Sequence, residues 1–277
     1  MHPRFRLPGA AAAVAAVLLC GPVAQRLLAQ SFDRLQSAEI ERFLTEAPIV
    51  RLGETLGGVT RSRQAVLQLE GVSHYAVWKT IDQKRTGVTQ LGGSASEINF
   101  FDTWKTEVPA YELDKLIGLK MVPAAVARTY RNTEGALIAW VDLGMSEAER
   151  LKKQLTPPDS AAWSQNMANV LLFDNLIYNV DRHSNNIWIT KNWDIILIDH
   201  SRSFRPHDEL KTETELRRFS RSLLAALEKL DRATLEAKMS KFLDRYQIEG
   251  VLARRDKIVS RARRLVKEQG EAAVLFP

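Results

Sequence analysis

The chain of 277 residues contains a single cysteine, Cys20, which lies close to the N-terminus. A framework of disulfide bonds is therefore excluded, and so are zinc sites built from cysteine thiolates. The sequence also lacks internal repeats, and its one compositionally biased tract is an alanine-rich stretch near its start. Apolar residues make up 45% of the chain, which is enough for a substantial core in one large domain or in two lobes.

Long apolar runs are scarce as well. The apolar stretch at residues 9–21 is shorter than the usual membrane-spanning helix. Two arginines precede it, and small residues with a possible cleavage point near Ala24 or Ala29 follow, which is the layout of a secretory signal peptide. We therefore expect residues 1–29 to be a signal peptide or an uncleaved N-terminal anchor. The first predicts an exported, periplasmic or extracellular protein, and the second predicts association with a membrane through the N-terminus.

The excess of positive charge is small. The net charge of +6 includes three arginines within residues 1–29, a segment without acidic residues, so the rest of the chain carries +3. This excess is too small to indicate a nucleic-acid partner, and we expect none. The late basic residues are expected on the solvated faces of amphipathic helices, with contact to an anionic partner as the alternative. They are Arg217, Arg218, Arg221, Arg254, Arg255, Arg261, Arg263 and Arg264.

The most informative segment pairs two short apolar runs, residues 187–190 and 195–198, across a turn-forming sequence. Their composition predicts a β-hairpin. Asp181 and Asn186 precede the first run, and Asp199 follows the second. Because a hairpin brings its open ends together, these three side chains are expected to converge. Phosphoryl transfer uses such a set: one Asp accepts the acceptor's proton, while an Asn and a second Asp hold metal ions on the nucleotide phosphates.

The same segment carries a resemblance to a family. The step of five residues from Asp181 to Asn186 equals the D-x-x-x-x-N step of the protein-kinase catalytic loop. Asp-Arg-His-x-x-Asn followed by Ile-Asp-His resembles the atypical branch of the kinase fold, which includes phosphoinositide lipid kinases, the secretory-pathway kinases of the Golgi and uncharacterised bacterial relatives. These families have D-R-H where ordinary protein kinases have H-R-D. The resemblance implies an α+β fold with two lobes, a small β-rich N-lobe and a larger helical C-lobe.

The pattern along the chain predicts where these parts lie. We expect a helical linker at residues 30–48, the N-lobe at 49–142 and the C-lobe at 143–277, with a hinge near the last boundary. Period-two alternation predicts a hairpin of strands at 65–69 and 75–81, and apolar spacing predicts a helix at 106–119. Further strands are predicted at 126–128 and 137–141, a helix at 161–178 that delivers Asp181, and a helical tail from 213 to 267.

The first lobe must also supply groups that position the nucleotide. Lys79 ends Ala-Val-Trp-Lys, which is similar to V-A-I-K, and an ammonium there would stabilise charge on the α- and β-phosphates. Glu107 opens a segment that resembles E-x-A-A-[YF]-x-L-D-x-[IL]-L of the atypical kinases, in which the first Glu pairs with the lysine. Glu112 is the rival partner.

Two weaker signals complete the expected nucleotide site. Gly57 and Gly58 form a candidate phosphate loop, because glycines let the backbone approach phosphate and direct amide groups at it. The full G-x-G-x-x-G pattern is absent. Trp140, near the expected hinge, is a candidate border of an adenine pocket.

These observations predict a phosphotransferase that uses ATP with Mg²⁺ or Mn²⁺. Asp181 would act as the base, and Asn186 and Asp199 as metal ligands, while Asp174 is expected to support the catalytic loop and Arg202 to touch an anionic substrate or pair with an acid. The acceptor stays open between lipid, protein, sugar and small molecule. Two alternatives also stay open: a kinase-fold pseudokinase or ligand-binding protein without turnover, and a nucleotidyl (AMP) transferase.

Overall fold

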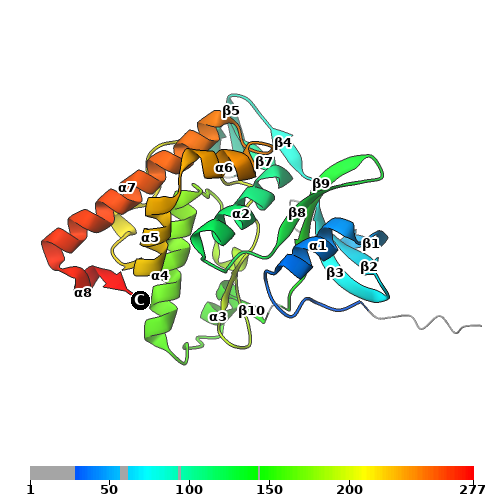
Figure 1. Ribbon diagram of the computed structural model, residues 1–277, viewed down its shortest axis with the longest axis horizontal. Coiled ribbons are helices and arrows are strands. Elements are labelled where there is room, and N and C mark those ends of the chain that lie inside the picture. The colour runs from blue at the N-terminus through cyan, green and yellow to red at the C-terminus, as the bar shows by residue number, and fades with distance from the viewer. Residues whose placement is uncertain (1–28, 57–61, 93–94, 143) are drawn as a thin grey trace, which may run out of the picture.

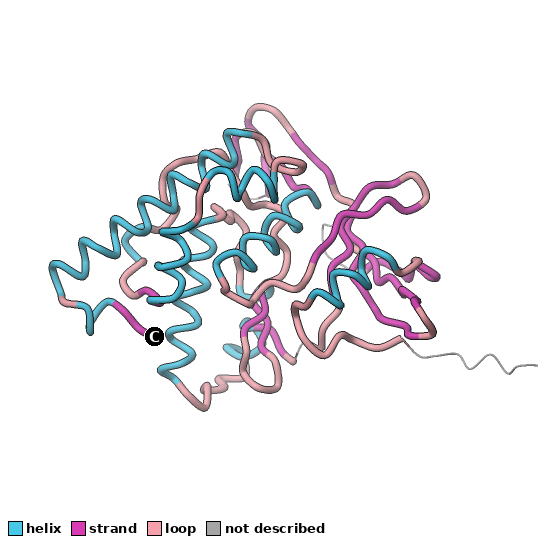
Figure 2. Tube along the Cα trace, in the orientation of Figure 1, coloured by secondary structure: helices cyan, strands magenta, loops and turns pink. Residues whose placement is uncertain are grey.

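The computed structural model describes residues 29–56, 62–92, 95–142 and 144–277. The chain forms a strand-rich part followed by a helical part, and these lie at opposite ends of the molecule in Figures 1 and 2. Within the described residues, the principal sheet has five antiparallel strands in the order β1-β2-β3-β9-β8. They are β1 (Ile49–Thr55), β2 (Arg63–Leu69), β3 (Val72–Lys79), β8 (Ala125–Tyr130) and β9 (Thr133–Ala139).

The hairpin of β2 and β3 forms where alternation predicts it, but its turn is tighter than expected. Glu70 and Gly71 both adopt positive φ angles, 51° and 80°, so the second strand already begins at Val72. Two consecutive residues with positive φ suit the right-handed twist of an antiparallel pair. Ala65 and Ala76 pair directly and are fully buried, which fixes one face of the hairpin against the core.

The expected linker helix is shorter than residues 30–48. Helix α1 spans Ala38–Glu46, because the side chain of Ser37 caps its start by accepting a hydrogen bond from the amide of Ile40. The chain before it runs beside the sheet instead, where Phe32 stacks on His74 at a centroid distance of 4.2 Å. This segment is therefore packed on the sheet rather than helical.

A strand-rich insertion separates β3 from the next helix and was not predicted. It comprises β4 (Asp82–Lys84), β5 (Val88–Gly92), β6 (Ala95–Ile98) and β7 (Phe101–Thr103), with β4 paired to β7 and β5 paired to β6. One turn of 3-10 helix, Trp104–Thr106, leads from it into α2 (Glu107–Ile117). We call residues 82–103 the insertion, which reaches from the sheet towards α6 and α7 (Figure 1).

The second part of the chain consists mainly of helices around a small sheet. The predicted hairpin forms as β11 (Ile187–Ile189) and β12 (Ile195–Leu197), and β10 (Met145–Ser146) adds a third strand. The helices are α3 (Glu147–Lys152), α4 (Ser160–Leu176), α5 (Arg221–Lys229), α6 (Arg232–Met239), α7 (Arg245–Gln269) and α8 (Glu271–Val274), and β13 (Phe219–Ser220) pairs with β14 (Leu275–Phe276). No helix among the described residues is long and apolar enough to cross a membrane.

One of the late arginines departs from the expected solvated helix face. Arg254, in the middle of α7, is fully buried. Its guanidinium donates to the carbonyl oxygens of Leu176 at 2.9 Å and Arg205 at 3.0 Å, and also to that of His207. Gly250 leaves room for this arrangement, because a Cβ atom there would lie 2.8 Å from Nη1 of Arg254. The expectation was wrong for Arg254 because carbonyl oxygens from distant segments, which helical periodicity cannot reveal, accept hydrogen bonds from its Nε and Nη1.

Candidate active site

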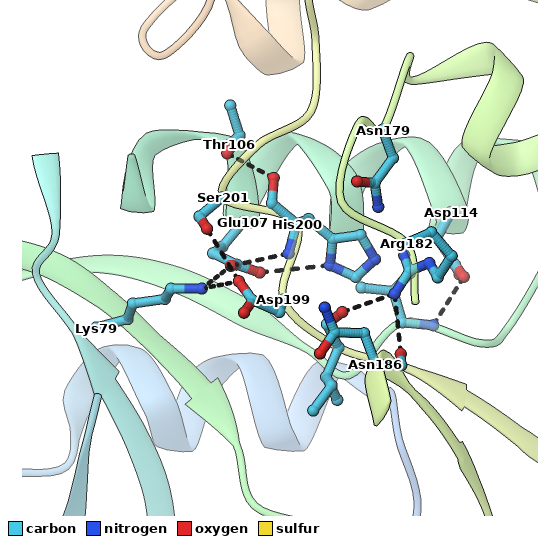
Figure 3. A network of polar contacts seen from close by, with 12 residues as sticks. Lys79, Thr106, Glu107, Asp114, Asn179, Arg182, Asn186, Asp199, His200 and Ser201 are labelled. Atoms are coloured by element: carbon cyan, nitrogen blue, oxygen red, sulfur yellow. Dashed lines mark hydrogen bonds and ion pairs between the residues drawn. The ribbon is translucent and has the colours of Figure 1, made fainter. Parts of the chain in front are cut away.

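Lys79 lies at the centre of a buried ion cluster. Lys79 is the last residue of β3, and only 3% of its surface is exposed. Its Nζ donates to Oε1 of Glu107 at 2.7 Å and to Oδ1 of Asp199 at 2.5 Å (Figure 3). Burial alone would lower the pKa of Lys79, but the charges of the two carboxylates outweigh it and raise that pKa above its ordinary value. The cluster therefore holds a permanent ammonium between the sheet, α2 and the segment after β12.

Glu107 is the acid that fixes this ammonium from the side of α2. Its Oε1 also accepts the backbone amide of His200 at 3.0 Å, and its Oε2 lies 3.4 Å from Nδ1 of the same residue. Burial would raise the pKa of Glu107, yet the charge of Lys79 and the hydrogen bonds from His200 lower it to about 2. Glu112 bonds instead to Lys115 at 3.0 Å, so Glu107 is the acid of the two that contacts Lys79.

Asp199 follows β12 on a sharp turn. Its φ is +58°, a conformation that costs about 1 kcal/mol or more for a residue other than glycine. The turn is held on its far side by Thr106, whose Oγ1 donates to the carbonyl oxygen of His200 at 2.8 Å. Ser201 Oγ donates to Oδ1 of Asp199 at 2.9 Å. Burial opposes the ionised form, but the charge of Lys79 dominates and lowers the pKa of Asp199, which keeps the carboxylate negative.

Asp181 and Asn186 lie in one loop between α4 and β11. The side chain of Asn179 accepts the amide of Asp181 at 2.9 Å, and Nδ2 of Asn186 donates to the carbonyl oxygen of Asp181 at 3.3 Å. The amide of Ile198, just before Asp199, donates to the carbonyl oxygen of Asn186 at 3.2 Å. The hairpin thus brings the loop of Asp181 and Asn186 beside Asp199, as its geometry implied.

Arg182 supports this loop from inside. Its Nε donates to both carboxylate oxygens of Asp174, at 3.1 and 3.0 Å, and its Nη1 donates to the carbonyl oxygens of Asn186 at 2.9 Å and Ile198 at 2.7 Å. The Arg182 side chain is only 7% exposed. Arg182 is therefore a structural tie between α4, the loop and β12.

Asn186 and Asp199 carry oxygen atoms that suit a divalent cation such as Mg²⁺ or Mn²⁺. Among the described residues, Oδ1 of Asn186 and Oδ2 of Asp199 accept no hydrogen bond. Such ions prefer oxygen ligands and complete their shell with water and phosphate oxygens. The described residues contain no cluster of three or more His, Cys, Asp or Glu side chains that could hold a metal alone. The residues present therefore fit a cation whose remaining ligands are water and phosphate oxygens.

The structure does not test the other expected residues of the nucleotide site. Gly57 and Gly58 lie outside the described residues. Trp140 is half-buried; its carbonyl oxygen accepts the amide of Phe32 at 2.8 Å, and its ring centroid lies 6.2 Å from that of Tyr75. No hydrogen bond or ring contact among the described residues joins it to Lys79, and its place beside an adenine stays a prediction.

Sequence reasoning identified Arg202 near the site but missed its neighbours Glu97 and Arg205. Arg202 pairs with an acid, one of the two options considered for it: its Nη1 lies 3.1 Å from Oδ1 of Asp181, and its Nη2 bonds to Glu97. Arg205 also bonds to Glu97. Glu97 belongs to β6 in the insertion, more than eighty residues before Asp181. No local motif marks it, so only the fold could have revealed it.

No protein-family model matches the sequence, and no curated protein matches it either. Solved structures do resemble the fold. A hydra Fam20 protein with sugar shares 15% identity over 86% of this chain and 91% of its own, with a TM-score of 0.63. The Golgi casein kinase with Mn and ADP bound shares 14% identity over 86% of this chain and 78% of its own, with a TM-score of 0.59.

A bacterial structure is also similar, the Helicobacter pylori proinflammatory kinase CtkA. It shares 12% identity over 79% of this chain and 96% of its own, with a TM-score of 0.50. Identities this low establish the fold alone. The chain has an atypical kinase-like α+β fold, with a β-rich N-terminal region and a helical C-terminal region.

Proposed function

We propose that this protein is a metal-dependent phosphotransferase that transfers a phosphoryl group from ATP to a hydroxyl acceptor. The observation that carries the proposal is the buried ammonium of Lys79, held at 2.7 Å from Glu107 and 2.5 Å from Asp199. Such a cluster is costly to bury unless its charges are paired, and kinases use a lysine paired with an acid to contact the nucleotide phosphates, which supports the proposal. The similar Golgi casein kinase has Mn and ADP bound, which supports this choice of ligands.

The roles of the residues follow from their contacts. Lys79 would stabilise charge on the α- and β-phosphates, and Glu107 would keep its ammonium in position. Asn186 and Asp199 would hold Mg²⁺ or Mn²⁺, which when bound neutralises the phosphate charge. Asp181, whose side chain is 39% exposed, would accept the proton of the acceptor hydroxyl. Most of the catalysis would come from positioning and from charge stabilisation.

The set of residues argues against a pseudokinase. Lys79 contacts both Glu107 and Asp199, and the loop that carries Asp181 and Asn186 is also present. Transfer of AMP remains the competing chemistry, since it uses the same nucleotide. Lipid, protein, sugar and small-molecule acceptors are all compatible with an exposed Asp181.

The nucleotide product separates these reactions. We expect the protein to release ADP from ATP in the presence of Mn²⁺. With water as the acceptor the release should be slow, and a true acceptor should make it faster. Chromatography of the nucleotides together with an assay for pyrophosphate measures this. Release of pyrophosphate without ADP would show transfer of AMP instead of a phosphoryl group. ATP that stays intact would favour a ligand-binding role.

We further propose that the protein is exported, with residues 1–29 acting as a signal peptide or, if uncleaved, as a membrane anchor. The leader-like arrangement of arginines and apolar residues supports this. Free ATP is scarce outside the cytoplasm, so export would require a nucleotide supply in the compartment where the protein acts. An anchor that leaves the domain on the cytoplasmic side would remove this requirement.

A further inference from the structure

The insertion is fastened to the segment that follows Asp199. Arg205 is 4% exposed, and its guanidinium donates to the carbonyl oxygens of Asn99 at 3.1 Å and Phe101 at 3.2 Å. It also lies over the Phe101 ring, 3.6 Å from the centroid, and bonds to the carboxylate of Glu97. Arg205 therefore contacts three alternate residues of the insertion: Glu97, Asn99 and Phe101.

Arg202 connects the same carboxylate to the catalytic loop. Its Nη2 bonds to Oε2 of Glu97, while its Nη1 donates to Oδ1 of Asp181 at 3.1 Å. Glu97 uses its other oxygen, Oε1, for Arg205. The result is a continuous chain of ion pairs, Asp181–Arg202–Glu97–Arg205, which runs from the catalytic loop to the insertion. We call it the four-residue ion chain.

Glu97 is the member on which the ion chain depends. Two guanidinium groups bind one carboxylate, and the side chains of Arg202, Arg205 and Glu97 are only 15%, 5% and 18% exposed. Burial lowers the pKa of Arg205 to about 10; Glu97 opposes this shift, and the charge of Arg202 adds to it. Without the Glu97 charge the two guanidinium groups would repel each other in a poorly solvated place.

A cavity of about 880 Å³ lies between the insertion and the segment after Asp199. Glu97, Arg202 and Arg205 line it, and so does Val180, the neighbour of Asp181. None of Lys79, Asp181, Asn186 and Asp199 lines it, so it is distinct from the nucleotide cluster and reaches the catalytic loop only at Val180. A volume of this size has room for an acceptor group next to Val180, at the edge of the catalytic loop.

We propose that Glu97 is a positioning residue, which acts through Arg202 to hold the carboxylate of Asp181 in place. The role rests on the proposed function, because it takes Asp181 as the acceptor's base. It also links the insertion to the catalytic machinery: the docked insertion adds a support on the Asp181 carboxylate to the one that Arg182 gives the loop from inside. Glu97 itself does not touch the reacting atoms.

The test compares Glu97→Gln with the conservative Glu97→Asp and with a control, Glu134→Gln. Glu134 is an exposed residue of β9 beside the β8–β9 turn, and its side chain makes no hydrogen bond or ion pair with the described residues. Hydrogen–deuterium exchange of the full chain without nucleotide gives the first measurement. Glu97→Gln is expected to speed exchange about tenfold or more both in residues 88–101 and in residues 180–186, and Glu134→Gln in neither.

Steady-state kinetics of ATP turnover, with water as acceptor, gives the second measurement. Glu97→Gln should lower kcat about tenfold or more and leave the KM for ATP within about twofold. Glu97→Asp, which keeps the negative charge, should lower kcat less. Exchange that rises only in the insertion, or a kcat like that of the unchanged protein, would overturn the inference. If the unchanged protein turns over no ATP, the proposed function fails, and exchange in residues 180–186 still decides whether Glu97 orders the catalytic loop.

Discussion

Replacing Lys79 with methionine is expected to lower the rate of ATP turnover by roughly 10²–10³-fold, the loss typical when one group that stabilises transition-state charge is removed. Methionine keeps much of the length and apolar bulk of the side chain but removes the ammonium that contacts Glu107 and Asp199. The measurement is kcat for release of ADP in the presence of Mn²⁺.

Lys152→Met is the matched control for this variant. Lys152 ends α3, is exposed, and makes no hydrogen bond or ion pair with the described residues. Its replacement should leave turnover unchanged within about twofold. Equal rates for the Lys79 variant and the unchanged protein would remove Lys79 from the proposed mechanism. A loss of folded structure would instead show as a changed circular dichroism spectrum, and Lys79→Arg would then serve as the milder variant.

Glu107→Gln is expected to destabilise the fold by about 3–5 kcal/mol, because it leaves a buried ammonium short of one of its two carboxylates. It should also change the dependence of stability on pH. The pKa of Glu107 is about 2 in the folded protein, below its ordinary value of 4.5, so the unfolded chain binds the proton more readily. The stability that Glu107 contributes is therefore fully present above pH 4.5 and is lost as the pH falls towards 2.

Urea denaturation between pH 2 and 7 measures both effects. The unchanged protein should lose stability across this window, and Glu107→Gln should lose less over the same range. Glu112→Gln is the control from the same helix, since Glu112 pairs with the partly exposed Lys115 rather than with Lys79. Identical pH slopes for the unchanged protein and Glu107→Gln would contradict the buried pairing.

The sequence is most predictive where the chemistry is local. The hairpin around residues 187–198 could be placed because apolar runs, turn residues and the spacing from Asp181 to Asn186 lie within one short segment. Lys79 at the end of β3 and Glu107 at the start of α2 were also identifiable from short patterns, and the structure shows them 2.7 Å apart. Their functional roles remain predictions.

What the sequence missed depends on contacts between distant segments. The insertion consists of very short strands with mixed polar residues, for which alternation gives little signal. Glu97 gains its importance only from two arginines more than a hundred positions later. Arg254 resembles any basic residue of an amphipathic helix, and only the fold shows that carbonyl oxygens of distant residues accept its hydrogen bonds. Glu97 and Arg254 were missed because their partners come from segments far away in the sequence.

The most direct test of a nucleotide and metal site is isothermal titration of the protein lacking residues 1–29 with ATP, with and without Mn²⁺, beside Asp199→Ala. We expect binding by the unchanged protein that depends on Mn²⁺, and loss of that binding in the variant, because Asp199 contacts Lys79 through one carboxylate oxygen and is proposed to bind the metal through the other. Binding of equal strength by both proteins, or by neither, would contradict the account.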